Sequence, residues 1–314
     1  LEGDDDRFFS VAMQVAAHEA RLGHGRLAEE LRALIDEAKS RRGAAPPVPI
    51  SRPRGELASL LEASYPKARL GEMILGDALA EQIQRVIREQ RHAGRIVEHG
   101  LSPRRKLLLI GPPGTGKTMT ASVLAGELGL PLLQVRLDGL LTKFMGETAA
   151  KLRQIFDATG QTRGVYFFDE FDAIGSQRGL GNDVGEIRRV LNSFLQMLEQ
   201  DRSHSLIIAA TNHPEILDPA LFRRFDDVLH YELPDTAQIA QLLKARLART
   251  AVKRVAWSRL ADAAVGLSYA EVTRASDEVL KDALIQGRER IREAEIGAMI
   301  EERQAIAARL RKKS

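Results

Sequence analysis

The segment of residues 111–118 most clearly combines residue types and spacing that could do chemistry. It reads Gly111-Pro-Pro-Gly-Thr-Gly-Lys-Thr118, directly after the apolar run Leu107–Ile110 and before a helical stretch, Met119–Leu128. A chain that turns from a strand into a helix can direct several backbone N–H groups at one phosphate, and glycine removes the side chains that would block the approach. This Walker A spacing predicts that Lys117 reaches the β- and γ-phosphates of a nucleotide and that the Thr118 hydroxyl binds Mg²⁺.

Two adjacent carboxylates stand at the end of another apolar run. The segment Gly164-Val-Tyr-Phe-Phe-Asp-Glu170 has the pattern of a buried strand that ends in Asp169 and Glu170. In an open parallel sheet such a strand end lies beside the phosphate loop, because ligands bind at the carboxyl edge. We expect Asp169 to hold Mg²⁺ and Glu170 to be the general base that polarises the water attacking the γ-phosphate. The alternative is that both carboxylates only cap the next helix.

Short apolar runs separated by helical patterns must position these residues. The expected strands are Leu107–Ile110, Leu132–Val135, Val165–Phe168, Leu206–Ala210 and Val228–Tyr231. Short buried runs that alternate with helices indicate a parallel sheet covered on both faces. The predicted fold class is therefore α/β, a P-loop NTPase with a doubly covered, parallel, five-stranded sheet.

Composition and periodicity divide the chain into four parts. Residues 1–42 are expected to form an N-terminal helical hairpin, broken at Gly23-His24-Gly25, that recruits a substrate or a partner. The Pro-rich residues 43–55 are expected to be a semi-rigid linker. Residues 56–233 would form the large α/β domain. The helical pattern of residues 234–314 predicts a C-terminal all-helical lid that ends in a charged helix.

Charge and composition exclude several classes of protein. The 314 residues include 46 Lys and Arg against 43 Asp and Glu, a net charge of +3, which argues against a nucleic-acid partner. No apolar run approaches the ~18 residues of a membrane-spanning helix, so we expect no membrane partner. The absence of Cys rules out disulfides and thiolate metal sites and is compatible with a reducing compartment. Because the acidic start Leu1-Glu-Gly-Asp-Asp-Asp6 is unlike a signal peptide, we expect a cytoplasmic protein.

Four motifs in a fixed order make the sequence resemble the AAA+ ATPases. After the phosphate loop come Asp169-Glu170, Ala210-Thr-Asn212 and Leu221-Phe-Arg-Arg-Phe225, and the resemblance covers about residues 57–286. The local detail looks most like the clades around katanin and spastin, in a bacterial-looking stand-alone form. The resemblance implies an ATP hydrolase that converts ATP and water to ADP and phosphate, with ATP and Mg²⁺ as cofactors. It also implies a homo-oligomeric ring, which we expect to be a hexamer.

The resemblance assigns further residues to the nucleotide site. Asn212 matches the sensor 1 position and would hold the attacking water with Glu170; alternatively, it is only a turn residue before His213-Pro214. The residues expected to contact the nucleotide are Gly76, Asp77, Gly111, Pro112, Pro113, Gly114, Thr115, Gly116, Lys117, Thr118, Met119, Gly266 and Ala270.

Two consecutive arginines match the paired arginine fingers of the katanin-like group. These are Arg223 and Arg224. A guanidinium offers a planar fork that neutralises charge growing on the γ-phosphoryl oxygens, and in this family the neighbouring subunit supplies it. The resemblance therefore implies an active site at a subunit interface and a nearly inactive monomer. The alternative is that both are surface arginines paired with Asp226 or Asp227.

The segment Lys143-Phe-Met-Gly-Glu-Thr148 resembles the family's substrate-gripping pore loop. Lys143, Phe144 and Met145 would face a central channel and contact an extended polypeptide without regard to its side chains. The alternative is an ordinary core contact of an aromatic residue on a helix. The Gly-rich residues 175–185 would supply a second pore loop.

Two further segments resemble the parts of the family that surround the nucleoside. Ile74-Leu-Gly-Asp77 matches the segment that lies along adenine in relatives, and Gly266-Leu-Ser-Tyr-Ala-Glu271 resembles the sensor 2 region. In the second segment Tyr269 and Glu271 replace the usual Gly and Asp. Because no arginine stands at a convincing sensor 2 position, we expect nucleotide contact there through backbone and packing.

The function expected from these features is that of a ring-forming ATPase that remodels, unfolds or disassembles protein substrates through a central pore. One alternative is an ATP-switched loader of DNA or of a complex, which the basic tail of residues 309–313 favours weakly. Another is a unit that drives a separately encoded partner protease. His18-Glu19 lacks the H-E-x-x-H spacing of a zinc protease, so any cleavage is expected from another chain.

Overall fold

The computed structural model describes residue 53 and residues 55–140, 145–174, 184–217, 219–250 and 255–311. The expected N-terminal hairpin lies outside these residues, as does the expected linker apart from residues 53 and 55. The first pore-loop residues Lys143 and Phe144 also lie outside them, and of Met145 only the backbone is described.

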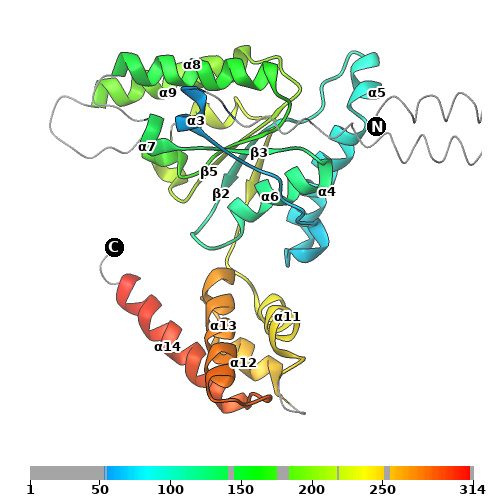
Figure 1. The fold of residues 1–314 in the computed structure, drawn as a ribbon, viewed down its shortest axis with the longest axis vertical. Coiled ribbons are helices and arrows are strands. Elements are labelled where there is room, and N and C mark those ends of the chain that lie inside the picture. Colours follow the sequence, from blue (N-terminus) through cyan, green and yellow to red (C-terminus); the bar gives the residue numbers. More distant parts are fainter. Residues whose placement is uncertain are drawn as a thin grey trace, which may run out of the picture. The chain divides into compact units, whose positions relative to one another are not determined.

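A mixed sheet forms the centre of the described α/β part (Figure 1). Its strands are β1 (Leu61–Ser64), β2 (Lys106–Ile110), β3 (Leu132–Val135), β4 (Val165–Phe168), β5 (Leu206–Thr211) and β6 (Asp227–His230). The order across the sheet is β1-β3-β4-β5-β2-β6, and every neighbouring pair is parallel except β1 with β3. The five expected parallel strands are confirmed, and the expected count of five is corrected by β1, an antiparallel edge strand.

Helices cover both faces of this sheet, as expected for parallel strands that are buried on both sides. The helices of this part are α3 (Leu57–Leu60), α4 (Asp77–Arg91), α5 (Ala93–Glu98), α6 (Lys117–Leu128), α7 (Leu137–Leu140), α8 (Met145–Gln161), α9 (Val184–Gln200) and α10 (Pro219–Phe222). Short 3-10 turns are η1 (Leu70–Glu72), η2 (Phe171–Ile174) and η3 (Pro214–Ile216). Figure 1 shows α8 and α9 on one side of the sheet and α4 and α6 on the other.

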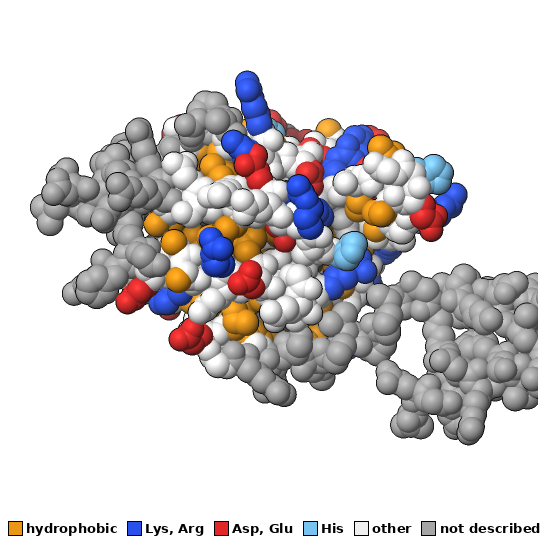
Figure 2. Space-filling model, turned by 90° about the horizontal axis from the view of Figure 1, so that it is seen from above, with side chains coloured by type: hydrophobic (Ala, Val, Ile, Leu, Met, Phe, Trp, Pro, Cys, Tyr) orange, Lys and Arg blue, Asp and Glu red, His pale blue; other side chains and the backbone are white. Residues whose placement is uncertain are grey.

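The outer surface on the side of α8 and α9 is mixed in charge. Figure 2 looks onto this side and shows blue and red side chains interspersed, with apolar side chains in separate small groups. A nucleic-acid-binding surface usually carries a basic stripe, because binding is dominated by phosphate contacts. The described part of this face therefore gives no support to a nucleic-acid partner.

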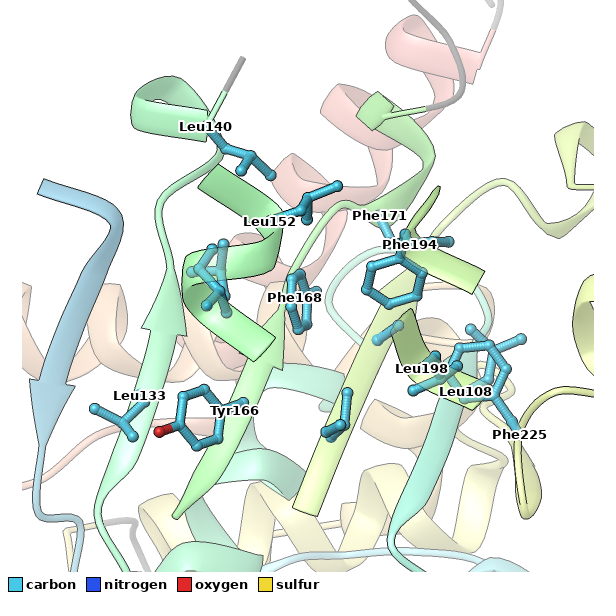
Figure 3. Close-up of a cluster of buried hydrophobic side chains, with 14 of the residues drawn as sticks. Leu108, Leu133, Leu140, Leu152, Tyr166, Phe168, Phe171, Phe194, Leu198 and Phe225 are labelled. Carbon is cyan, nitrogen blue, oxygen red and sulfur yellow. The ribbon is translucent and has the colours of Figure 1, made fainter. Parts of the chain in front are cut away.

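Aromatic side chains fill the layer between the sheet and helices α8 and α9 (Figure 3). The rings of Phe168 and Phe194 meet edge to face at 5.1 Å, and the centroid of Phe171 lies 4.6 Å from that of Phe194. Such pairs stabilise beyond the area they bury, and removing a buried Phe costs about 3–5 kcal/mol. This layer holds rigid the strand β4, which ends at the two carboxylates.

The described residues after β6 are almost entirely helical. Their helices are α11 (Thr236–Leu247), α12 (Trp257–Ala263), α13 (Tyr269–Ile285) and α14 (Glu293–Arg311). They enclose a second core of small and aliphatic side chains, among them Ile239, Leu243 and Ile300. Both α11 and α13 begin with a capping box, formed by Asp235 with Gln238 and by Ser268 with Glu271. None of the described helices is both long enough and apolar enough to cross a lipid bilayer.

Candidate functional site

The phosphate loop lies between the end of β2 and the start of α6, as the sequence predicts. At Gly111 (φ +147°) an added Cβ would lie 2.2 Å from the carbonyl oxygen of Tyr231, so no larger residue fits. Gly111 is the residue directly after β2. Gly116, directly before α6, has a left-handed backbone conformation (φ +105°). The glycines therefore allow a tight turn that ends at a helix N-terminus, where backbone N–H groups favour an anion.

Lys117 is turned back onto the loop that precedes it. Its Nζ donates to the carbonyl oxygens of Gly111 at 2.7 Å and Pro112 at 2.8 Å. Burial lowers the pKa of the Lys117 ammonium below its ordinary value, against the opposing effect of the Asp169 and Asp172 carboxylates. A phosphate group in the loop would stabilise the charged form of this lysine, because opposite charges favour each other's ionised states.

Thr118 and Asp169 meet at the carboxyl edge of the sheet. The Thr118 hydroxyl donates to Asp169 Oδ2 at 2.9 Å, and Asp169 Oδ1 accepts the backbone N–H of Glu170 at 3.0 Å. Asp169 thus contacts both the backbone of the adjacent residue and the helix of the phosphate loop, and the bond to the adjacent residue is not a helix cap. The pair presents hard oxygen ligands of the kind that Mg²⁺ prefers.

Glu170 has an unusual backbone. Among the described residues it is the one non-glycine residue with a positive φ, +47°. A non-glycine residue in this region costs roughly 1–2 kcal/mol, and such strain clusters at functional sites. Glu170 and Asp169 border an open hollow of about 330 Å³, which Arg136 and Glu62 also line. The turn therefore places a carboxylate beside a hollow that is open to solvent.

Asn212 directly follows β5, next to the phosphate loop. The loop's Gly111 N–H points at the carbonyl oxygen of Thr211 at 3.4 Å, which brings Asn212 to the same sheet edge as Lys117. The half-buried Asn212 is followed by a turn, since the His213 N–H donates to Thr211 Oγ1 at 2.9 Å. The structure thus brings Asn212 near the expected site while also showing the turn of the alternative explanation.

Sequence reasoning missed a buried link behind Asn212. The Thr211 hydroxyl donates to Asp172 Oδ1 at 2.8 Å, and both residues are buried. The bond ties β5 to the 3-10 turn after Glu170. It therefore fixes the spacing between Glu170 and Asn212, the two residues expected to hold the attacking water. A polar residue at the end of an otherwise apolar strand was the feature of the sequence that could have revealed it.

A second missed link lies beneath the phosphate loop. The hydroxyls of Thr120 and Tyr231 are 2.6 Å apart in a buried environment. Burial raises the pKa of Tyr231 well above its ordinary range, so its hydroxyl stays protonated. The contact joins α6 to the chain after β6, and helix spacing alone does not reveal it.

Arg223 and Arg224 lie at the amino ends of β2 and β6, whereas the phosphate loop lies at the carboxyl end of β2. They precede β6 by a few residues, and Asp226 accepts the backbone N–H groups of Arg105 and Lys106 at the start of β2. The phosphate loop follows the other end of β2, a five-residue strand that spans about 15 Å. Two exposed arginines of one chain are therefore separated from that chain's own Lys117 by the length of a strand.

The partners that the surface-pair alternative names are taken by other groups. Arg224 forms an ion pair with Glu199 near the end of α9, whereas Asp227 pairs with Arg104. Arg223 makes no ion pair with any residue in the described part of the chain. Arg224 is therefore a surface arginine in an ion pair, as the alternative expects, but with Glu199 in place of Asp226 or Asp227, and for Arg223 no such pair is seen among the described residues.

The helical module touches the phosphate loop through the segment expected from the resemblance. The Ala270 N–H donates to the carbonyl oxygen of Gly114 at 3.1 Å. A Cβ on Gly114 would lie 2.7 Å from Ser268 Oγ, so only glycine permits this contact. Gly266, three residues before α13 begins at Tyr269, adopts a positive φ of +89°, which glycine tolerates. The helical module thus meets the phosphate loop through backbone and close packing, and nucleotide contact by Gly266 and Ala270 stays a prediction.

The remaining predicted residues surround the same loop. Gly76 precedes α4 and Asp77 begins it, and the Thr115 hydroxyl donates to the carbonyl oxygen of Pro112 at 2.8 Å. Met119 lies on the first turn of α6 and is 40% exposed, which leaves an apolar side chain open beside the loop. These positions are compatible with nucleotide contact.

The donor set fits a nucleotide with Mg²⁺ better than a metal held by protein alone. Within the described residues no group of three or more His, Asp or Glu side chains could hold a metal ion. Mg²⁺ typically takes one or two protein ligands and completes its shell with phosphate oxygens and water. The Thr118–Asp169 pair beside a phosphate loop has this character.

Comparison with known proteins relates these features to one family. The family described as "ATPase family associated with various cellular activities (AAA)" matches residues 107–233. The chain is 34% identical over 313 residues to the uncharacterized AAA family ATPase y4kL of Sinorhizobium fredii, covering 98% of this chain and 94% of that protein. It is 30% identical over 270 residues to the ATP-dependent zinc metalloprotease FtsH of Helicobacter felis, covering 83% of this chain and 42% of that protein. With its P-loop NTPase fold, the chain therefore belongs to the AAA family of ATPases and is an ATP hydrolase.

Proposed function

We propose that this chain hydrolyses ATP with Mg²⁺ at the carboxyl edge of its sheet. Lys117 and the N-terminus of α6 would hold the β- and γ-phosphates, while Thr118 and Asp169 would hold Mg²⁺. Bound Mg²⁺ would neutralise charge on the phosphate oxygens. Glu170 would accept a proton from the attacking water as a general base, and Asn212 would orient that water. The Thr118–Asp169 contact of 2.9 Å supports this assignment.

We propose further that the site is completed by a second copy of the chain. The observation that carries this proposal is the placement of Arg223 and Arg224 at the sheet edge opposite their own phosphate loop. A head-to-tail contact would bring the arginines of one copy to the phosphates of the next, and such contacts form a ring when the rotation between copies closes. The guanidinium groups would then stabilise charge that develops during phosphoryl transfer. A hexamer is the ring that we propose.

The proposed substrate is protein, gripped in the channel of that ring by Phe144 and Met145. Differences in binding energy between ATP and ADP would move the helical module relative to the sheet, since only differential affinity can shift a conformational equilibrium. This part of the proposal depends on the resemblance of residues 143–148 to a pore loop. Phe144→Ala should keep ATP binding but lose substrate processing, and an unchanged rate of processing would exclude the pore role.

The similarity to FtsH, an ATP-dependent zinc metalloprotease, supports a second, more specific proposal. The matched region covers 42% of that protein. We propose that this chain can drive a separately encoded protease by delivering unfolded substrate to it. The proposed location is the cytoplasm, where ATP and Mg²⁺ are supplied. A pull-down with Glu170→Gln under ATP should recover the client or the protease.

The dependence of ATPase activity on protein concentration tests the shared site. Turnover per chain should rise steeply as copies associate, and sizing by light scattering should show the ring over the same concentration range. Full turnover per chain at a concentration where scattering gives a single copy would overturn the proposal. Arg223→Ala should keep ATP affinity and lose turnover, because it removes a group that acts on the neighbouring site.

A further inference from the structure

Two residues of the helical module that the proposed hydrolysis does not use, Gln238 and Tyr269, lie between the helix starts beside the phosphate loop. The Tyr269 hydroxyl donates to Gln238 Oε1 at 2.9 Å. The same oxygen accepts the backbone N–H of Asp235 at 3.0 Å as part of the α11 capping box. An amide oxygen has two lone pairs, so both acceptor positions of Gln238 are occupied.

These bonds fix the direction in which the Gln238 amide nitrogen points. The N–H of Asp235 can only donate, so turning the amide over would set two donors against each other. Gln238 Nε2 therefore faces away from the capping box and toward Gly76, where an added Cβ would lie 3.5 Å from this nitrogen. The amide N–H groups are presented along the segment that precedes α4.

The segment around Gly76 and the start of α13 flank the phosphate loop. Met73 Cε would lie 3.4 Å from a Cβ on Gly116, and Ala270 donates to the Gly114 carbonyl oxygen at 3.1 Å. A nucleotide whose phosphates occupy this loop must place its base beside the loop. Gln238 lies between both flanking segments, since its amide nitrogen occupies the space in front of Gly76 and its amide oxygen is bonded to Tyr269 of α13.

Tyr269 is suited to hold the amide in this orientation. Burial, followed by the Asp235 carboxylate, raises the pKa of Tyr269 to about 12. The hydroxyl therefore stays protonated and donates at neutral pH. A glycine at this position, as the resemblance to AAA+ proteins leads one to expect, would leave one lone pair of the Gln238 oxygen without this donor.

We propose that Gln238 determines base specificity by donating a hydrogen bond from Nε2 to a ring nitrogen of adenine, and that Tyr269 is the positioning residue that holds its amide. This inference rests on the proposed function, because it requires phosphates in the loop. The group that would be recognised is a ring nitrogen of the base that accepts a hydrogen bond. The donor that would face it, Gln238 Nε2, has a fixed direction.

The substitution Gln238→Glu tests the donor alone. Glutamate also serves in capping boxes, and it keeps the oxygen that accepts from Asp235 and Tyr269 while removing the N–H groups. The KM for ATP should rise about three- to tenfold, the loss expected for one neutral hydrogen bond, with kcat and the melting temperature unchanged. Gln241→Glu is the matched control, because it adds the same charge at an exposed position of the same helix. Tyr269→Phe should raise KM by a smaller factor.

Analogues of ATP identify the acceptor and keep the test independent of the variant's folding. The unmodified protein is assayed with 1-deaza-, 3-deaza- and 7-deaza-ATP, each of which lacks one ring nitrogen. One analogue should bind more weakly than ATP, and Gln238→Glu should not weaken its binding further. Equal KM values for ATP in Gln238→Glu and Gln241→Glu, or equal losses with ATP and all three analogues, would overturn the inference. An unmodified protein that does not bind ATP would instead overturn the proposed function, and the inference with it.

Discussion

The buried hydroxyl of Thr211 is the most informative position to change, because it links β5 to the turn after Glu170. The replacement Thr211→Val keeps the shape of the side chain but removes the donor to Asp172 at 2.8 Å and the acceptor for the His213 N–H at 2.9 Å. Thr211 is 0% exposed, so water cannot replace its bond to Asp172, whereas the N–H of the exposed His213 can turn to water. Loss of the hydrogen bond to the Asp172 carboxylate should lower the free energy of unfolding by about 1.5–3 kcal/mol.

The matched control is Thr211→Ser, which keeps the hydroxyl and loses one methyl group. This variant should lower the free energy of unfolding by about 1 kcal/mol. Urea unfolding with an unchanged m-value measures both differences, and steady-state ATP hydrolysis measures the effect on turnover. Valine should lower kcat more than serine does, because Asn212 directly follows the altered residue. Equal midpoints and equal kcat values for the two variants would refute the idea that this hydroxyl positions the site.

Three further substitutions test other parts of the account. Gly111→Ala should abolish ATP binding and lower the melting temperature, since its Cβ would lie 2.2 Å from the Tyr231 carbonyl oxygen; a normal melt would contradict the loop geometry. Although burial pushes the pKa of Asp201 upward, hydrogen bonds led by Arg105 hold it below its ordinary value of 3.8. Asp201→Asn should therefore lower the free energy of unfolding by about 3–5 kcal/mol at pH 7. The difference from the unmodified protein should shrink as the pH falls below ~4 and through the lower folded-state pKa of Asp201. Urea unfolding at pH 7 and pH 3 measures this change. Glu170→Gln should bind ATP with normal affinity and lose turnover about 100-fold or more, and undiminished hydrolysis would exclude it as the base.

The sequence was sufficient to predict the parallel strands and the phosphate loop. Runs such as Leu206–Ala210 are continuously apolar because parallel strands are buried on both faces, and that pattern is local. The glycines and Lys117 have a spacing that only one backbone geometry explains. Both features depend on residues close together in the chain.

What the sequence could not predict depends on contacts between distant residues. In the edge strand β1 the apolar Leu61 and Ala63 alternate with the exposed Glu62 and Ser64, but four residues are too short an alternation to indicate a strand by themselves. It forms because β3 offers an antiparallel pairing partner, Leu61 opposite Val135. The Thr120–Tyr231 contact joins residues 111 positions apart, and the bond from Tyr269 to Gln238 joins residues 31 apart.

The arginines show the same limit in another form. The motif predicted that Arg223 and Arg224 act at a phosphate, but their distance from Lys117 follows from the direction of β2 and β6 and not from the motif. Parallel pairing of Leu107 with Asp227 places the residues before β6 at the amino end of β2. This register separates the two arginines from the phosphate loop of their own chain. It therefore adds a geometric argument for a second copy to the resemblance.

Mixing two inactive variants is the most direct test of the shared site. Lys117→Ala removes the phosphate contact, and the double variant Arg223→Ala, Arg224→Ala removes the arginines that would serve the neighbouring copy. Each variant alone should lack ATPase activity, whereas an equal mixture should recover about a quarter of the unmodified rate per chain if copies assemble at random in a ring. A mixture that forms mixed rings but stays as inactive as its components would contradict the claim that two copies share the site.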